Sequence, residues 1–157
     1  MTGVSTENFN NNCMYNLCGS LMGFGSKTLG KFHAGVDMQH GGTIRAPFTG
    51  VLVAKGGTFG MAALYNQSNN VTFIFLHMTS ITTAAIGSVI SKGTYIGTES
   101  NIGTAGNHLH VEVHSGRVTN YAVATPSSNI PLGKDSNGNG HEVIVPYVYM
   151  GSCLNWQ

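Results

Sequence analysis

The sequence predicts an all-β protein: a single domain built on antiparallel β-sheets, with glycine-rich hairpins, long loops and few or no helices. Helix signals are almost absent, because no long stretch repeats apolar residues at helical spacing with good helix formers between them. Short runs of β-branched and aromatic residues recur at close spacing instead. Glycine supplies 22 of the 157 residues, about twice its usual share, which suits a chain with many tight turns.

Six segments carry the strand signal. Pro47 separates the segment that ends at Ala46 from the one that begins at Gly50, since proline cannot donate a hydrogen bond to a sheet. Lys92-Gly93, between the segments that end at Ile90 and begin at Thr94, fits a tight turn. Short strands joined by glycine-rich turns favour antiparallel pairing. The six segments are Thr43–Ala46, Gly50–Lys55, Asn70–Leu76, Ser88–Ile90, Thr94–Gly97 and His108–His114.

The composition excludes several classes of protein. Charged residues make up 8% of the chain, the formal net charge is +1 and the pI is about 7.8, so a basic surface for nucleic acid is not expected. A hydrophobic share of 41% argues against disorder. No run approaches 18 apolar residues, so no membrane span is expected. The first residues lack a basic start and an apolar stretch, so no signal peptide is expected in this chain.

The chain divides into parts of different character. We expect an N-terminal extension over residues 1–22, a domain over 23–150 and a short tail over 151–157. Within the domain, residues 115–141 are rich in Ser, Asn, Gly and Pro and resemble a long surface loop insertion. The apolar stretch Val143–Met150 then rejoins the core.

The cysteines leave the redox compartment open. Cys13, Cys18 and Cys153 are too few for a disulfide scaffold, and an odd number cannot pair fully within one chain. A Cys13–Cys18 or a Cys18–Cys153 bridge and three free thiols are all compatible with the sequence.

Histidine is the conspicuous polar residue, with seven histidines beside six carboxylates. His33 and Asp37 stand four residues apart. On a straight strand their Cα atoms would lie about 13 Å apart, too far for one metal ion, whose ligands lie within about 2.2 Å. The segment must therefore bend if both bind one ion, and Gly35 permits that bend. The alternative is a turn with an incidental His and Asp.

A second histidine pattern is His108-Leu109-His110. Every second residue from 108 to 114 is polar, and on a strand these share one face. The residues between them are apolar and predict the buried face. The polar face is therefore expected to meet water, a metal or a partner. Its members are His108, His110, Glu112 and His114.

Other catalytic motifs are absent from the sequence. His141-Glu142 is not followed by a second His at the spacing of a helical zinc-protease motif. The chain has no CxxC pair for a zinc finger or redox site, no GxSxG elbow and no phosphate-binding P-loop. Residues 135–140 (DSNGNG) lack the acidic positions of a calcium loop and indicate a turn.

Taken together and in order, the motifs resemble those of lysostaphin-type zinc endopeptidases, which cleave peptide bonds in bacterial cell walls. The resemblance covers about residues 23–114 and begins at Gly23-Phe24-Gly25. The matching pieces are HAGVD (33–37), GTIRAPFTGVLV (42–53), FIFLHM (73–78), VISKGTYIG (89–97) and GNHLHVEV (106–113).

The resemblance implies a catalytic metal site with one Zn²⁺ per chain. Its ligands would be His33, Asp37 and His110, which leave a fourth position for water. His77 and His108 would flank that water, one as general base and the other stabilising the oxyanion or protonating the leaving amine. The sequence does not divide these roles between them.

The resemblance also implies a substrate and a place of action. The substrate would be a peptide of bacterial peptidoglycan, in a stem-peptide cross-link or a bridge. We expect an extracellular or virion-associated protein, with other virion tail proteins as further partners in the second case. Residues 1–22 could cover the groove as an inhibitory segment.

Alternatives remain open at this point. If His108 and His110 both bound the ion with His33 and Asp37, the zinc would be structural. The chain could instead be an inactive wall-binding or scaffold module on the same fold. The hairpin sequences also resemble biotinyl-type domains, but the Met-Lys-Met turn is missing. Glu112 either supports a metal ligand through a hydrogen bond or is solvated, and solvation is the preferred interpretation. His40, His114 and His141 are expected to lie at the surface.

Overall fold

The computed structural model describes residues 35–38 and 42–119, together with the backbone of four short strands outside them. These residues form two main antiparallel sheets and contain no helix, which confirms the predicted all-β class. In this part of the chain no helix is long and apolar enough to cross a membrane.

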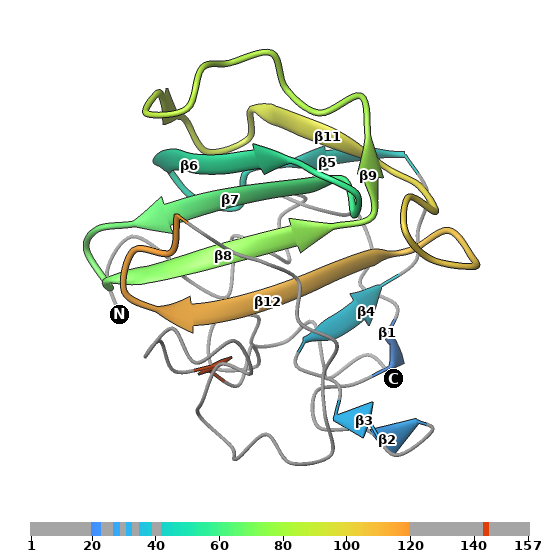
Figure 1. The fold of residues 1–157 in the computed structure, drawn as a ribbon. Coiled ribbons are helices and arrows are strands. Elements are labelled where there is room, and N and C mark those ends of the chain that lie inside the picture. Colours follow the sequence, from blue (N-terminus) through green and yellow to red (C-terminus); the bar gives the residue numbers. More distant parts are fainter. Residues whose placement is uncertain are drawn as a thin grey trace.

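The larger sheet has eight strands (Figure 1). β12 (Leu109–Ser115) lies near its centre and pairs with β8 (Val71–Leu76) along six residues. β4 (Val36–Met38) and β13 (Val143–Ile144) pair with different parts of β12, and β1 (Ser20–Met22) pairs with β4. In spatial order the strands are β1 (Ser20–Met22), β4 (Val36–Met38), β12 (Leu109–Ser115), β8 (Val71–Leu76), β7 (Met61–Asn66), β6 (Gly50–Gly56) and β10 (Val89–Ile90), with β13 (Val143–Ile144) beside β12.

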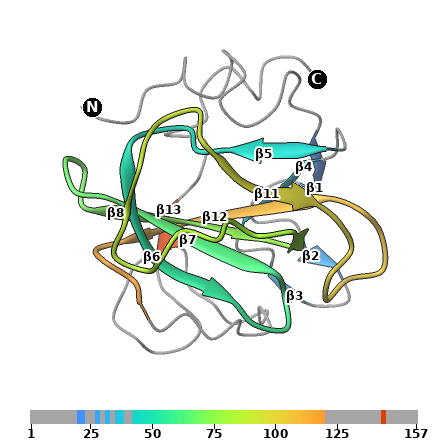
Figure 2. The same cartoon turned by 90° about the horizontal axis from the view of Figure 1, so that it is seen from above.

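The smaller sheet has three strands, in the order β5 (Thr43–Arg45), β11 (Tyr95–Glu99) and β9 (Met78–Thr79). Figures 1 and 2 show it on one side of the larger sheet. A separate two-stranded pair joins β2 (Lys27–Thr28) to β3 (Lys31–Phe32).

The main hydrophobic core joins the two sheets. Ile44 and Ile96 of the smaller sheet belong to the same buried cluster as Phe73 of β8. The rings of Phe48 and Phe73 meet edge to face, with centroids 4.9 Å apart, a favourable aromatic geometry. This cluster covers one face of the larger sheet.

The opposite face of the larger sheet is buried as well. Ile74 and Leu76 of β8 pack there with Val53, Ala63 and Val118. β8 is therefore buried at every residue, which explains why VTFIFL is a continuous apolar run rather than an alternating one.

The structure confirms a strand in each predicted segment and adds others. Strands occur in all six predicted segments. The turn at Lys92-Gly93 is present, with the Thr94 N–H donating to Ser91 O at 3.0 Å and Gly93 at φ 83°. The sequence did not predict β7, because Met, Ala and Leu are helix formers. β4 was expected only as a bend; a bend does occur at Gly35, and β4 follows it.

The chain returns to the larger sheet after the long polar stretch. Val143 and Ile144 form β13, which pairs with His114 and Val113 of β12. Residues 145–150 of the predicted apolar return lie outside the described residues. The division into 1–22, 23–150 and 151–157 stays a prediction, as does the loop insertion 115–141.

Phe73→Ala tests the core between the sheets. Phe73 is fully buried, so its loss is expected to lower the free energy of unfolding by about 3–5 kcal/mol. Urea unfolding followed by circular dichroism measures the change. Val89→Ala is the control: Val89 is 68% exposed, and its variant should lie within about 0.5 kcal/mol of wild type. Equal losses in the two variants would contradict this account of the core.

Candidate functional site

The pairing of β4 with β12 brings together two residues that are 73 positions apart in the sequence. Asp37 lies directly opposite His110, and directly opposed residues of an antiparallel pair project from the same face. Asp37 Oδ1 is 2.8 Å from His110 Nδ1. On the other side of β12, His110 faces Leu76 of β8. The site therefore stands on the face of the larger sheet that turns away from the main core.

Gly35 permits this close approach of the two segments. A Cβ atom at residue 35 would lie 2.5 Å from Val111 O and 2.6 Å from His110 Nε2. These distances are shorter than any side chain tolerates, and one of the two obstructing atoms belongs to the backbone. Glycine is thus needed here because the His110 ring occupies the space of a side chain.

His77 follows the last residue of β8 and has a left-handed backbone, with φ at 68°. This conformation is uncommon outside glycine. Its N–H donates to Phe59 O at 2.6 Å, and its carbonyl accepts from the Ser100 N–H at 2.9 Å. Hydrogen bonds on both sides of the residue therefore hold the unusual conformation, which sets the direction of the imidazole.

Ser100 connects the backbones of two histidines. Its hydroxyl donates to His77 O at 2.6 Å and accepts from the Ile102 N–H at 3.3 Å. Its carbonyl accepts from the His108 N–H at 3.1 Å. Ile102 O in turn lies 2.8 Å from His77 Nδ1. Ser100, which the sequence did not single out, thus fixes the spacing of His77 and His108.

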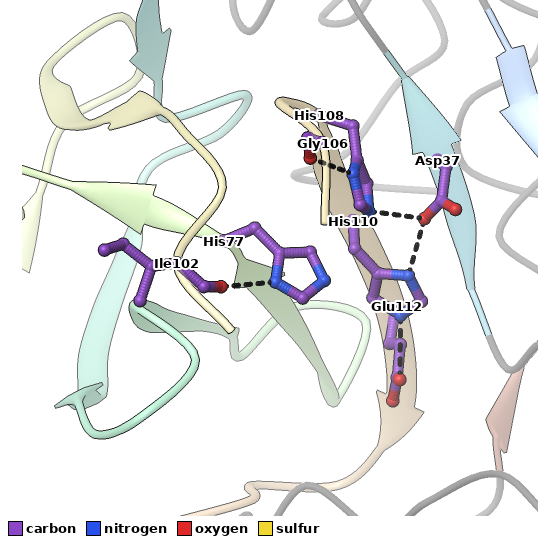
Figure 3. Close-up of polar contacts among 7 residues, drawn as sticks. All are labelled: Asp37, His77, Ile102, Gly106, His108, His110 and Glu112. Carbon is purple, nitrogen blue, oxygen red and sulfur yellow. Dashed lines mark hydrogen bonds and ion pairs between the residues drawn. The ribbon is translucent and has the colours of Figure 1, made fainter. Parts of the chain in front are cut away.

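The rings of His77 and His108 lie side by side, with centroids 4.6 Å apart, and those of His77 and His110 are 5.9 Å apart. His108 Nδ1 lies 2.9 Å from Gly106 O, and its Nε2 lies 3.5 Å from Asp37 Oδ1. Figure 3 shows His77 between Ile102 on one side and the pair His108 and His110 on the other. Four of the five predicted site residues thus converge; the fifth, His33, lies outside the described residues.

Burial lowers the pKa of His77 to about 4, and the nearby His108 and His110 add to this shift. The hydrogen bond to Ile102 only partly offsets it. His77 is therefore a neutral imidazole at neutral pH. Since Ile102 O can only accept, the proton is on Nδ1 and the lone pair is on Nε2.

The predictions that Glu112 is solvated and that His114 lies at the surface were wrong. His110, Glu112 and His114 are 6%, 3% and 1% exposed. Glu112 is opposite Ile74 of β8 in the sheet, and Ile74 belongs to the second apolar cluster. The polar residues are therefore buried beside that cluster. His40 and His141, the other expected surface histidines, lie outside the described residues.

Glu112 is a partner of His110 rather than a solvated carboxylate. Its Oε1 is 2.9 Å from His110 Nε2, and its Oε2 is 2.7 Å from His114 Nε2. The sequence left a supporting role for Glu112 open but favoured solvation, and it predicted that His114 lies at the surface. The signal was the alternation of polar residues at 110, 112 and 114, but alternation alone does not distinguish a buried polar face from a solvated one.

The carboxylates and histidines of this cluster stabilise each other's charged forms. Burial alone would lower the pKa of His110, but its hydrogen bonds with Asp37 and Glu112 raise it to about 9. Burial alone would raise the pKa of Glu112, but the hydrogen bonds with His110 and His114 hold it well below its ordinary range. His110 thus lies between two carboxylates, whose negative charge favours a cation at this position.

The donor set fits zinc. Asp37 Oδ1 and His110 Nδ1 face each other, and carboxylate oxygen with imidazole nitrogen is a common ligand combination for Zn²⁺. Within the residues described, no three His, Cys, Asp or Glu side chains surround one point as metal ligands do. A third ligand from His33 would come from outside those residues. The three cysteines also lie outside them.

Comparison with solved structures shows the same fold. Lysostaphin from Staphylococcus simulans has a TM-score of 0.66 at 20% identity; the match covers 100% of this chain and 57% of the lysostaphin chain. The catalytic domain of a prophage-encoded M23 protein, EnpA from Enterococcus faecalis, has a TM-score of 0.56 at 22% identity, covering 64% of this chain and 82% of that domain. A zinc-containing peptidase from Vibrio cholerae has a TM-score of 0.51 at 22% identity, covering 60% of this chain and 32% of the peptidase.

The sequence itself identifies the family. A comparison with curated protein sequences gives no significant match. The family model of peptidase family M23, however, matches residues 31–123, more than half of the chain. This range includes all four convergent side chains and also His33. The chain therefore belongs to peptidase family M23.

Proposed function

We propose that this protein is a zinc-dependent endopeptidase that hydrolyses peptide bonds in bacterial peptidoglycan, in a stem-peptide cross-link or a bridge. The observation that carries the proposal is the convergence of one carboxylate, Asp37, with the imidazoles of His77, His108 and His110. The family adds its chemistry, because M23 peptidases are typically zinc-dependent peptidoglycan endopeptidases.

The proposed ligands of one Zn²⁺ per chain are His33, Asp37 and His110. When bound, the ion supplies Lewis acidity for the scissile carbonyl and lowers the pKa of water to about 7. On the protein side, Gly35 lets Asp37 approach His110. Gly106 O engages His108 Nδ1, and His108 Nε2 is farther from Asp37 Oδ1 than His110 Nδ1 is, at 3.5 Å against 2.8 Å. This difference favours His108 as a catalytic group over a fourth ligand.

His77 is suited to accept a proton. Its Nδ1–H donates to Ile102 O, so the Nε2 lone pair remains available. With its pKa lowered to about 4, the ring is neutral over the range in which a hydrolytic water must lose a proton. We assign His77 as the proton acceptor from that water.

His108 is suited to donate a proton. In its protonated form its Nδ1–H donates to Gly106 O, and its Nε2–H lies toward the Asp37 carboxylate at 3.5 Å. That Nε2 proton can stabilise the developing oxyanion and then pass to the leaving amine. The ring contact of 4.6 Å places His108 beside His77, so that one substrate can reach both.

The substrate sets where the protein would act. Peptidoglycan lies outside the bacterial membrane, so the enzyme would work extracellularly or be carried on a virion. The likeness to a prophage-encoded M23 protein favours the virion, where other tail proteins would be its partners.

Wall cleavage with His110→Ala tests the proposal. Loss of the ligand should lower the rate of wall hydrolysis by roughly a thousandfold, because bound metal supplies several kcal/mol of transition-state stabilisation. Turbidity of purified cell walls and release of new amino groups measure hydrolysis. A chelator should abolish wild-type activity and added Zn²⁺ should restore it.

The matched control is His141→Ala, since the sequence predicts a surface histidine there. It should keep wild-type activity. Lysis that persists in His110→Ala and in chelator would contradict a zinc mechanism. A chain that binds zinc and walls but cleaves no wall type would instead be the inactive binding module.

Gly35→Ala tests the approach of the two segments. The added methyl group collides with Val111 O and His110 Nε2, so it should separate Asp37 from His110. We expect zinc affinity to fall at least about tenfold and the free energy of unfolding to fall by about 1–3 kcal/mol. Competition with a chromogenic chelator and urea unfolding measure the two effects.

The control for Gly35→Ala is Gly106→Ala. A Cβ atom at residue 106 meets nothing within 4 Å, so both quantities should stay near their wild-type values. Wild-type zinc affinity in Gly35→Ala would show that the close approach is unimportant for the site.

His77→Asn tests the protonation state of His77. Its pKa is about 4 in the folded chain and near 6.5 in the unfolded chain, so between these values the unfolded chain binds more protons. Lowering the pH from 6.5 to 4 should therefore destabilise wild type more than His77→Asn. Asn tolerates the left-handed backbone. Urea unfolding of both proteins in chelator, at pH 7 and pH 5, measures the difference. An equal loss of unfolding free energy in the two proteins would contradict a lowered pKa of His77.

A further inference from the structure

We propose that Glu112 and His114 are positioning residues for the metal-binding nitrogen of His110. The three side chains form a hydrogen-bonded series on β12, here called the His110–Glu112–His114 relay. The inference rests on the proposed function, since it assigns His110 to a metal. It goes further by giving a task to two buried residues that neither bind the ion nor reach the substrate.

The contacts of the relay hold both oxygens of the Glu112 carboxylate in place. Glu112 Oε1 lies 2.9 Å from His110 Nε2, and Glu112 Oε2 lies 2.7 Å from His114 Nε2. The Glu112 and His114 side chains are 5% and 1% exposed. With one histidine on each oxygen, the carboxylate cannot rotate without breaking a bond in a place where water does not replace it.

The relay determines which nitrogen of His110 is available to a metal. An ionised carboxylate only accepts hydrogen bonds, so the Nε2 of His110 must carry a proton. In the neutral ring this leaves the lone pair on Nδ1, the atom that faces Asp37 Oδ1 at 2.8 Å. Glu112 thereby fixes both the tautomer and the ring direction that ligation beside Asp37 requires.

Stability alone gives little reason to keep this arrangement. Burying a carboxylate between two histidines carries a desolvation penalty, and well-packed apolar residues often stabilise a protein as much or more. The neighbouring strand β8 carries apolar residues at the opposite positions, since Ile74 faces Glu112 and Leu76 faces His110 across the sheet. The need to orient His110 explains why the relay is present in apolar surroundings despite its desolvation penalty.

Zinc affinity of full-length variants tests the inference without any assay of catalysis. Glu112→Gln keeps the shape but removes the charge, and should weaken Zn²⁺ binding by about 10–100-fold. His114→Leu should weaken it by a smaller factor, because it frees one carboxylate oxygen. His114→Gln keeps a donor for Glu112 Oε2 and should restore most of the affinity. Competition with a chromogenic chelator measures each constant.

Thr72→Val is the matched control. Thr72 is buried on β8 directly opposite His114, and its hydroxyl donates to Gly116 O and accepts from the Val118 N–H. Its replacement should lower the free energy of unfolding while leaving zinc affinity within about twofold of wild type. Equal weakening in Thr72→Val and Glu112→Gln would reduce the effect to packing and overturn the inference.

A measurement on the wild-type protein covers the case in which the variants do not fold. Nitrogen-15 NMR of the zinc-loaded chain reports the protonation of each ring nitrogen, and His110 should carry its proton on Nε2. A proton on Nδ1 would overturn the inference. Zinc binding of wild-type strength in Glu112→Gln would overturn the inference alone, whereas a wild-type chain that binds no zinc would overturn the proposed function as well.

Discussion

The site depends on one backbone interaction, the antiparallel pairing of β4 with β12. That register puts Asp37 opposite His110 and Met38 opposite Leu109, so the same pairing sends acid and imidazole to one face and apolar residues to the other. A slip of one residue would reverse both faces. The main core therefore holds the register by burying Met38 and Leu109. This register in turn sets the positions of Asp37 and His110 in the site.

The apolar surroundings of the site give its histidines different properties. His77 is partly buried and its hydrogen-bond partner is a neutral carbonyl, so its pKa falls. His110 is more deeply buried, but it lies between two carboxylates, and its pKa rises. The contrast lies in the charge of the hydrogen-bond partners, since the residue type is the same. The site therefore holds a neutral imidazole, His77, beside an imidazole whose surroundings favour positive charge, His110.

Much of the fold could be read from the sequence because its signals are local. β-branched and aromatic runs between glycine-rich turns predicted six segments that contain strands. The motifs HxxxD, FLH and HxH contain the four side chains that converge, Asp37, His77, His108 and His110; His33 lies outside the described residues. β7 was missed because its Met-Ala-Ala-Leu residues favour helices; only its position between β6 and β8 makes it a strand. The alternation at 110, 112 and 114 predicts that these side chains share a face, but it does not predict what covers that face, so the burial of Glu112 and His114 could not be predicted.

By itself, the sequence determined the all-β class, the order of the strand segments and the chemical types of residue available to a site. These depend on neighbours a few positions apart. Only the tertiary structure decided that sheet register puts Asp37 directly opposite His110, that Ser100 links His77 to His108, and that Glu112 is buried between two histidines. Each of these contacts depends on sheet register or on loops that return from distant parts of the chain. Local sequence patterns do not determine which distant segments come into contact. The packing of the apolar core determines it.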